Sequence, residues 1–344
     1  MASRYPSRRN RQAHLHRSFN NHGSFHRVIE FWDLLDYRIP GEDKVRKAGE
    51  FKLLEPGQVP EGFVVSSFTG DKVYQFFDHG DRSFINHPEP IATKISEYRK
   101  GAKAFIKHLS ENGGKAVLSR VKAVPLPKNR DDFFDALCDA YPNAFVYSFF
   151  SKLTGSWVGA TPETLITSVD GVGTTMALAG TRRTDEELPW TEKEFEEHEL
   201  VADFIQNNLE GVKIQNILRS DRKEKVSGPV RHLLTEFMFD LPQGKAWELA
   251  QKLHPTPAVS GWPVKDALKL IADNERHDRR FYAGIIGLVG EETKLYVNLR
   301  CAEYGHNKLY LYLGGGFTKD SDPEAEWEET ENKAATLINV LKNG

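Results

Sequence analysis

Five short strings within residues 253–330 decide the fold: LHPTPAVSG (253–261), ERHDRRFYAGIIG (275–287), YVNLRCAEY (296–304), YLGGGF (312–317) and SDPEAEWEET (321–330). Apolar runs typical of β-strands alternate here with polar stretches rich in Gly, Arg and Glu. Three consecutive glycines at 314–316 interrupt one such run, and a cluster of carboxylates follows them. A β core that carries glycines beside carboxylates is typical of a site for an anion and a metal ion.

The same reading along the rest of the chain predicts helices and strands in mixed order. Apolar positions at helical spacing, acidic first turns and a proline after Asp322 predict helices over 93–111, 131–141, 187–210, 246–254, 263–275 and 322–341. Period-two apolar patterns predict strands over 115–124, 145–151, 156–169, 173–181, 282–290 and 295–303. The sequence therefore predicts an α+β fold in which largely antiparallel β-sheets form a sandwich-like core with helices packed outside.

Composition narrows the class of protein. The chain has 344 residues, of which 39% are hydrophobic, and this suits a large globular core. A net charge of −3 gives no indication of nucleic-acid binding. Cys138 and Cys301 lack CxxC spacing, which fits a reducing cytoplasm rather than a disulfide framework. No apolar run reaches the roughly 18 residues that a membrane-spanning helix needs.

The first 29 residues differ from the rest of the chain. They contain six arginines, four histidines and no acidic residue before Glu30. Such a start occurs in organelle transit peptides, but a short basic run is more often a solvated segment. We interpret residues 1–29 as a disordered basic tail and residues 30–344 as a single α+β domain.

Two pairs of glutamates occur at i,i+3 spacing on predicted helices, namely Glu194 with Glu197 and Glu326 with Glu329. One such pair usually marks a solvated helix face. Two pairs on separate helices, with no Cys or His ligand set, suit Mg²⁺, which takes one or two direct carboxylates and keeps several waters. Arg300 interrupts a run that otherwise reads as a buried strand, so it needs a partner, either a structural acid or a bound anion.

Several strings together resemble the chorismate-utilising enzymes. They are KAVLSR (115–120), GATPE (159–163), LAGTRR (178–183), EHELV (197–201), VRHLL (230–234) and HPTPAVSG (254–261). The resemblance covers about residues 100–340, and it implies the fold, the substrate chorismate and a bound Mg²⁺.

The resemblance also implies a role for each candidate site residue. Lys115 is expected to act as the general base and Glu163 as the general acid. Glu197 and Glu329 are expected to bind Mg²⁺ directly, whereas Glu194 and Glu326 hold metal-bound waters. The residues expected to bind the substrate are Gly180, Thr181, His232, Ala258, Tyr282, Arg300, Gly314, Gly316 and Lys333.

Two positions distinguish branches of the family. Anthranilate synthases usually have Gln where Lys115 stands, but aminodeoxychorismate synthases share the lysine. HPTPAVSG is close to the string of isochorismate synthases, whereas salicylate synthases carry Thr at the position of Ala258. The expected reaction is thus addition of water at C2 of chorismate with loss of the C4 hydroxyl.

Alternatives remain at this level. Salicylate synthase and aminodeoxychorismate synthase are the alternative activities, and a non-catalytic chorismate-binding protein is disfavoured because Lys115, Glu163 and the four glutamates are all present. We expect a cytoplasmic monomer without a glutamine amidotransferase subunit. Menaquinone, siderophore and salicylate formation all stay open as the pathway served.

Overall fold

The structure is a computed structural model that describes residues 14–16, 28–30, 32–78, 88–185, 188–227 and 230–343. Most of the basic tail predicted over residues 1–29 lies outside these residues. Within it, β1 (His14–His16) and β2 (Val28–Glu30) pair only with each other. No helix of the described residues has the length and apolar character needed to cross a membrane.

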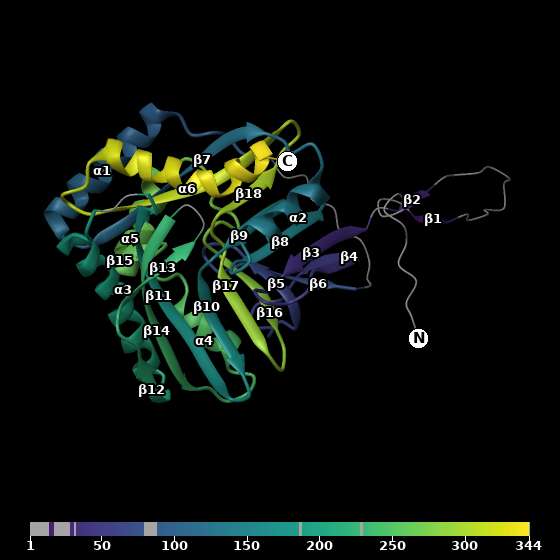
Figure 1. Ribbon diagram of the computed structural model, residues 1–344, viewed down its shortest axis with the longest axis horizontal. Coiled ribbons are helices and arrows are strands. Elements are labelled where there is room, and N and C mark those ends of the chain that lie inside the picture. Colours follow the sequence, from purple (N-terminus) through teal and green to yellow (C-terminus); the bar gives the residue numbers. More distant parts are fainter. Residues whose placement is uncertain are drawn as a thin grey trace.

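Two antiparallel sheets form the body of the molecule (Figure 1). The first contains, in spatial order, β15 (Gly261–Trp262), β7 (Lys115–Pro125), β19 (Lys308–Phe317), β18 (Cys301–Tyr304), β9 (Gly155–Thr161), β8 (Phe145–Ser151) and β3 (Asp33–Arg38). The second contains β6 (Val73–Phe77), β5 (Gly62–Ser66), β16 (Ile285–Val289), β17 (Thr293–Val297), β10 (Thr164–Val169), β11 (Val172–Arg183) and β14 (Val230–Asp240), with β12 (Gln215–Arg219) and β13 (Lys223–Ser227) beside β14. Every pairing among these strands is antiparallel, as the sequence predicts.

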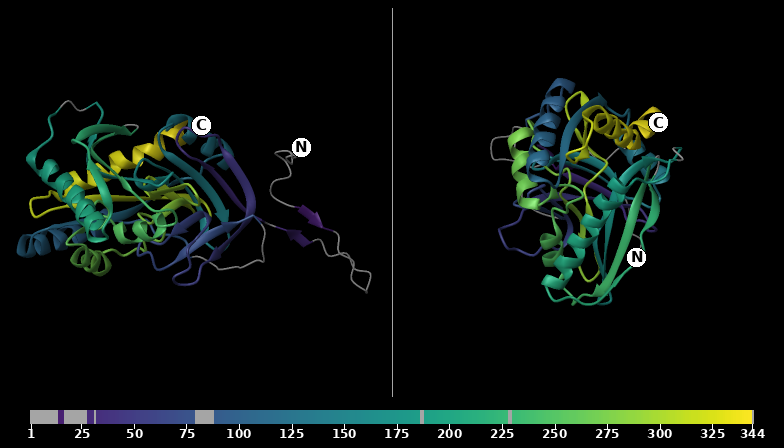
Figure 2. Two further views of the ribbon diagram at one scale, coloured as in Figure 1. Left: turned by 90° about the horizontal axis from the view of Figure 1, so that it is seen from below. Right: turned by 90° about the vertical axis from the view of Figure 1, so that its left-hand side faces the viewer.

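One strand joins the two sheets. The first half of β4 (Val45–Leu53) pairs with β3, and its second half, from Glu50, pairs with β6. Gly49 lies at this change of partner, where a side chain would run into the carbonyl of Phe77 and the ring of Phe76. The sheets therefore fold over each other as a continuous sandwich (Figure 2).

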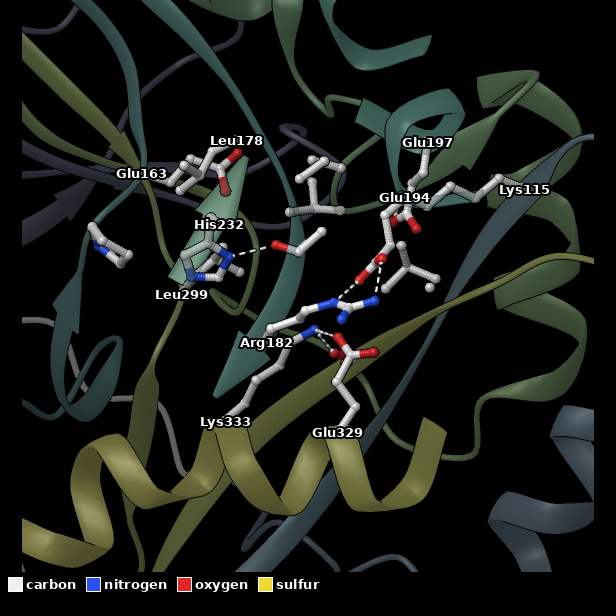
Figure 3. Close-up of a pocket in the computed structure, with 18 of the residues that line it drawn as sticks. Lys115, Glu163, Leu178, Arg182, Glu194, Glu197, His232, Leu299, Glu329 and Lys333 are labelled. Carbon is white, nitrogen blue, oxygen red and sulfur yellow. Dashed lines mark hydrogen bonds and ion pairs between the residues drawn. The ribbon is translucent and has the colours of Figure 1, made fainter. Parts of the chain in front are cut away.

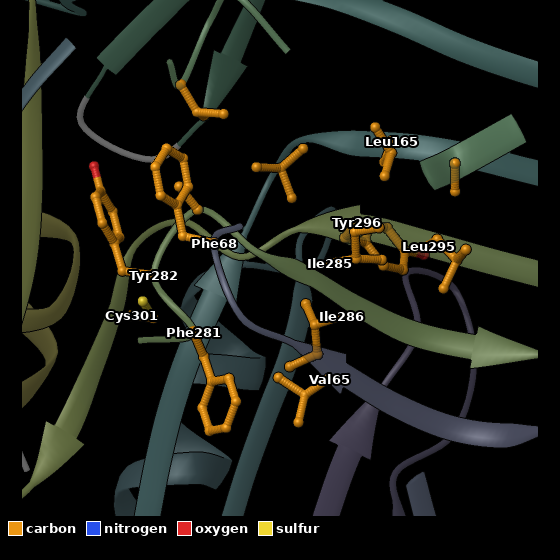
Figure 4. Close-up of a cluster of buried hydrophobic side chains, with 14 of the residues drawn as sticks. Val65, Phe68, Leu165, Phe281, Tyr282, Ile285, Ile286, Leu295, Tyr296 and Cys301 are labelled. Carbon is orange, nitrogen blue, oxygen red and sulfur yellow. The ribbon is translucent and has the colours of Figure 1, made fainter. Parts of the chain in front are cut away.

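The main core lies between the sheets and contains side chains from both. In β8, Phe145, Tyr147 and Phe149 point into this core, whereas Val146 points to the opposite face. This alternation follows from the two-residue repeat of a β-strand. Figure 4 shows part of the core, where side chains that include Ile286 and Val65 pack together.

Six helices of the described residues cover the outside of the sandwich: α1 (Ile95–Asn112), α2 (Arg130–Ala140), α3 (Glu192–Gly211), α4 (Ala246–Leu253), α5 (Val264–Asn274) and α6 (Pro323–Asn343). α2 and α6 cover the outer face of the first sheet through a second apolar cluster, and α3 lies along β11 and β14. The predicted arrangement of helices outside a sandwich is thus confirmed.

Several element boundaries differ from the prediction. The strand expected over 156–169 is two strands, β9 and β10, separated by Pro162 and Glu163. The helix expected from residue 187 begins only at Glu192, because Pro189 disfavours helical backbone before it and Thr191 with Glu194 forms a capping box. The strand expected over 295–303 is two strands, β17 in the second sheet and β18 in the first. Arg300 has a φ of 49° at the break, so the chain turns there from one sheet to the other.

A buried asparagine holds this crossing. The side chain of Asn298 is fully buried; it accepts a hydrogen bond from the Tyr147 hydroxyl (2.7 Å) and donates one to the carbonyl of Phe281 (2.9 Å). Its backbone is also bonded to Ala283 and Gly284. Asn298 therefore ties the crossing to β8 and to the segment that leads into β16.

We predict that Asn298→Ala destabilises the fold. It removes the acceptor of the Tyr147 hydroxyl and one of the two donors to the Phe281 carbonyl, which keeps the N–H of Gly284. Loss of these buried hydrogen bonds should cost about 1–3 kcal/mol. Urea unfolding followed by circular dichroism measures the loss, and Asn112→Ala on the exposed end of α1 is the control, expected within about 0.5 kcal/mol of wild type. Equal unfolding free energies for the two variants would show that the crossing does not depend on Asn298.

Candidate functional site

A cavity of about 300 Å³ opens where the glycine-rich end of β19 meets α3, α6 and the crossing at Arg300. Fourteen of the fifteen residues that the sequence singled out line it: Lys115, Glu163, Gly180, Glu194, Glu197, His232, Ala258, Tyr282, Arg300, Gly314, Gly316, Glu326, Glu329 and Lys333. The fifteenth, Thr181, follows Gly180 on β11, but its side chain lies outside the described residues. Their roles remain predictions, but the structure brings them to one place.

The expected base and acid lie at opposite ends of this cavity. Figure 3 shows Lys115 beside Glu197 at one end and Glu163 beside Leu178 at the other. Lys115 is the first residue of β7 and only 4% exposed. Its ammonium donates a hydrogen bond to Glu197 Oε1, so the buried charge is paired.

At the other end of the cavity, the expected acid Glu163 is buried. This residue follows Pro162 in the turn between β9 and β10. Burial raises the pKa of Glu163 to about 7, although the nearby cations, with Arg300 the strongest, act in the opposite direction. A carboxyl with such a pKa is protonated in part of the molecules at neutral pH and is suited to donate a proton.

Arg300, His232 and Gly180 form a connected group beside Glu163. His232 Nδ1 donates a hydrogen bond to the carbonyl of Gly180 (2.7 Å), and Arg300 Nη2 faces His232 Nε2 at 3.5 Å. Burial, together with the positive charge of Arg300, lowers the pKa of His232 to about 3. The imidazole is therefore neutral, and it orients Arg300 toward the cavity without adding charge.

α6 contributes the carboxylates on the opposite wall. Lys333 forms an ion pair with Glu329 (2.6 Å), one turn away on α6, and donates a hydrogen bond to the carbonyl of Gly314 (2.8 Å). Burial opposes ionisation of Glu329, but Lys333, together with Lys115 and Glu326, outweighs burial and lowers the pKa of this carboxyl. The helix begins where sequence predicts, because Asp322 Oδ1 accepts hydrogen bonds from the backbone N–H groups of Glu324 and Ala325.

The three glycines of β19 give these side chains room. A Cβ at Gly314 would lie 2.6 Å from the Tyr282 hydroxyl, and one at Gly316 would lie 3.0 Å from Lys115 Cε and 3.1 Å from Glu197 Oε1. Pairing of β18 with β19 ends at Cys301 and Tyr312, so the edge of β19 beyond Tyr312 faces the cavity instead of that strand. Backbone groups at this edge can approach a bound anion closely because no side chain intervenes.

Glu194 occupies a different position from the other carboxylates. Arg182 Nε and Nη2 bind its two oxygens at 2.7 and 2.6 Å, and Thr191 donates to it from both its backbone and its hydroxyl. These hydrogen bonds outweigh burial and lower the pKa of Glu194. Both oxygens of Glu194 thus already accept hydrogen bonds, from Arg182 and from the cap of α3. Fewer of their lone pairs remain to bind a metal-bound water.

The remaining carboxylates fit a hard divalent cation. Glu326 lies in hydrogen-bonding contact with Glu329, and two carboxylates this close repel each other unless a proton or a cation lies nearby. Among the described residues no three acidic, His or Cys side chains converge to enclose an ion by themselves. Mg²⁺ does not require such a cage, because it keeps several waters. Glu197, Glu326 and Glu329 are therefore the residues that would hold it.

Sequence reasoning missed some of the cavity wall. Arg182, Thr191, Leu178 and Leu299 line the cavity but were not singled out. Arg182 follows Gly180 by two residues in a string already quoted, and this spacing was the available signal. Its partner Glu194 lies on another element, so the ion pair itself could not be read from the sequence.

We predict that His232 stays neutral, with the proton on Nδ1, from about pH 5 to about pH 8. Nitrogen-15 NMR of histidine-labelled protein reports the tautomer; His232→Gln identifies the signal and the exposed His306 serves as internal reference. Arg300→Gln should raise the pKa of His232, because a nearby positive charge is removed. Protonation of both ring nitrogens in this pH range would contradict the arrangement.

Two curated proteins are similar to part of this chain. EntC of Escherichia coli (strain K12), an isochorismate synthase, is 33% identical over 214 residues, covering 58% of this chain and 55% of EntC. Anthranilate synthase component 1 of Aquifex aeolicus is 29% identical over 234 residues, covering 62% of this chain and 46% of that protein. The chain thus spans about half the length of these curated relatives.

Structure and family comparisons extend over more of the chain. The crystal structure of DhbC from Bacillus anthracis superposes with a TM-score of 0.77 at 25% identity, covering 91% of this chain and 97% of that one. The model of the family described as chorismate binding enzyme matches residues 79–342. This match includes every strand from β7 to β19 and every residue that lines the cavity. The chain therefore belongs to the chorismate-binding enzymes.

Proposed function

We propose that this chain is an isochorismate synthase, which converts chorismate to isochorismate. The observation that supports this most strongly is a buried carboxyl with a pKa of about 7, Glu163, facing a buried lysine, Lys115, across one cavity. Such a pair suits a reaction in which one side chain takes a proton while another donates one. Ala258 and the string around it favour this branch over salicylate synthase.

Binding of chorismate would use the cations and glycine edge of the cavity. In this proposal Arg300, Tyr282 and Lys333, which line the cavity, hold the enolpyruvyl carboxylate, and Arg300 can do so with two parallel hydrogen bonds. The backbone at Gly314 and Gly316 would hold the other carboxylate. Mg²⁺ held by Glu197, Glu326 and Glu329 would neutralise these carboxylates and fix the ring carboxylate of the substrate.

In the proposed reaction a water supplies a new hydroxyl at C2, and the hydroxyl at C4 is lost. Lys115 accepts a proton from a water, and the oxygen of that water forms a bond to C2 as the ring double bonds shift. The bond from C4 to its hydroxyl breaks, and Glu163 protonates the departing oxygen, which leaves as water. One proton has then passed from Glu163 to the departing hydroxide and one from the attacking water to Lys115. Loss of a proton from Lys115 to solvent and uptake of one by Glu163 restore both groups.

The ion pair between Lys115 and Glu197 bears on when Lys115 can act. While the ammonium of Lys115 donates a hydrogen bond to Glu197, it cannot accept a proton as a base. Glu197 cannot serve Lys115 and a cation equally, so a cation at Glu197 would displace the ammonium of Lys115. This ammonium has to release a proton to solvent before it can accept one from the attacking water. Because water is the nucleophile, we propose that no amidotransferase subunit is needed.

The direct test is incubation with chorismate and Mg²⁺, with and without an ammonium salt, followed by chromatographic separation of the products. Isochorismate should accumulate without pyruvate, and Lys115→Gln should reduce its formation by roughly 10²-fold or more. Stoichiometric pyruvate with salicylate, or an aminated product, would identify another branch of the family.

We predict that turnover depends on Mg²⁺ through Glu329. Glu329→Gln removes one anionic oxygen ligand, so the Mg²⁺ concentration needed for half-maximal turnover should rise by roughly tenfold or more. Glu328→Gln, at the adjacent exposed position of α6, is the matched control and should behave as wild type. Full activity in excess chelator would rule out the metal role.

The pKa of Glu163 predicts how the rate depends on pH. A general acid acts in its protonated form, so kcat should decline as the pH rises through about 7, approaching a tenfold loss for each further pH unit. His232 contributes no step in this range, because its pKa of about 3 keeps it neutral. Turnover that stays constant well above pH 7 would argue against Glu163 as the acid.

A further inference from the structure

A second, smaller cavity of about 70 Å³ adjoins the first behind the turn that carries Glu163. Pro162 and Arg300 line both cavities and so form the wall between them. Polar side chains on its far side include Tyr141, Asn143 and Lys225. The proposed acid therefore projects into the main cavity from a turn whose other side borders the second cavity.

Lys225 projects from β13 into the second cavity. Its ammonium donates a hydrogen bond to the carbonyl of Pro162 (3.1 Å) and lies 3.7 Å from the sulfur of Met176. The carbonyl of Pro162 belongs to the peptide bond that joins it to Glu163. Lys225 therefore holds the backbone from which the Glu163 side chain projects, although Lys225 does not line the main cavity in the described structure.

The charge of Lys225 is also directed at Glu163. The groups whose charges act on this carboxyl are Arg300, Lys225, Lys115 and Lys333, and the neutral His232 shares its cavity. Lys115 and Lys333 form ion pairs with Glu197 and Glu329. The hydrogen bonds described for Lys225 go instead to an uncharged carbonyl and a thioether sulfur. The other charges that act on Lys225 are Glu236 and Lys223, which form an ion pair with each other.

We propose that Lys225 is a positioning residue for Glu163, acting through the Pro162 carbonyl and through its positive charge from the side opposite the substrate. This inference rests on the proposed role of Glu163 as the general acid. Burial disfavours the charged form of both groups, and each group lowers this penalty for the other. Lys225 thus limits how far burial raises the pKa of Glu163 and keeps this carboxyl able to lose its proton near neutral pH.

The test compares Lys225→Gln and Lys225→Met, which remove the charge, with Lys225→Arg, which retains it. Lys223→Met is the matched control, since Lys223 lies two residues away on the same strand and pairs with the exposed Glu236. Carbon-13 NMR of protein labelled at the glutamate carboxyl gives the titration of Glu163, and Glu163→Gln identifies its signal. The pH dependence of kcat is measured in parallel on the full chain with chorismate and Mg²⁺.

Loss of the charge should make Glu163 a roughly three- to tenfold weaker acid. The pH at which kcat declines should then rise by about half a unit to one unit. Lys225→Arg should restore both midpoints, and Lys223→Met should change neither. Unchanged titration of Glu163 in both neutral variants would overturn the inference. Absence of chorismate turnover in the wild type would count against the proposed function alone, because the NMR titration needs no turnover.

Discussion

The site depends on one crossing of the chain between the two sheets. Asn298, fully buried and bonded to Tyr147 and Phe281, fixes the point where the chain leaves the second sheet for the first. The left-handed backbone at Arg300 then directs its guanidinium into the cavity. Because β18 starts only after this turn, its pairing with β19 ends at Tyr312, and the glycine edge beyond faces the same cavity. The turn at Arg300 thus brings to the cavity both the guanidinium of Arg300 and the backbone edge of β19 that β18 leaves unpaired beyond Tyr312.

Charge balance is the second constraint on this cavity. Buried charges destabilise a fold unless they are paired, and here Lys115 pairs with Glu197 and Lys333 with Glu329. These pairs satisfy the same side chains that a dianionic substrate and a divalent cation would recruit. Ligand binding would therefore exchange partners for charges that are already buried, instead of burying new ones. The ion pairs explain how the protein can fold without its ligands although many ionisable groups line one cavity.

Local signals made much of this architecture predictable. Period-two patterns predicted the strands from β7 to β11 but not β12 to β14. Asp322 predicted the start of α6, and short strings contained most of the residues that line the cavity. The late start of α3 has a local cause, Pro189 and the capping box of Thr191 with Glu194. The other differences result from contacts between elements distant in sequence. The break at Arg300 depends on Asn298 bonding to Tyr147 on β8, and the role of Lys225 depends on β13 lying beside the Pro162 turn. Neither contact leaves a periodic pattern in the chain.

Relocation of a hydroxyl places a particular demand on the acid and the base. The reaction proposed for this chain should be reversible, since the same kinds of bonds break and form. Each group would then donate a proton in one direction and accept one in the other. A carboxyl with an ordinary pKa would stay ionised and could not donate, and one raised further by burial would not accept. The cations around Glu163 oppose its burial and hold its pKa near 7, between these two limits. We infer that the surrounding cations, Lys225 among them, serve to keep the acid usable in both directions.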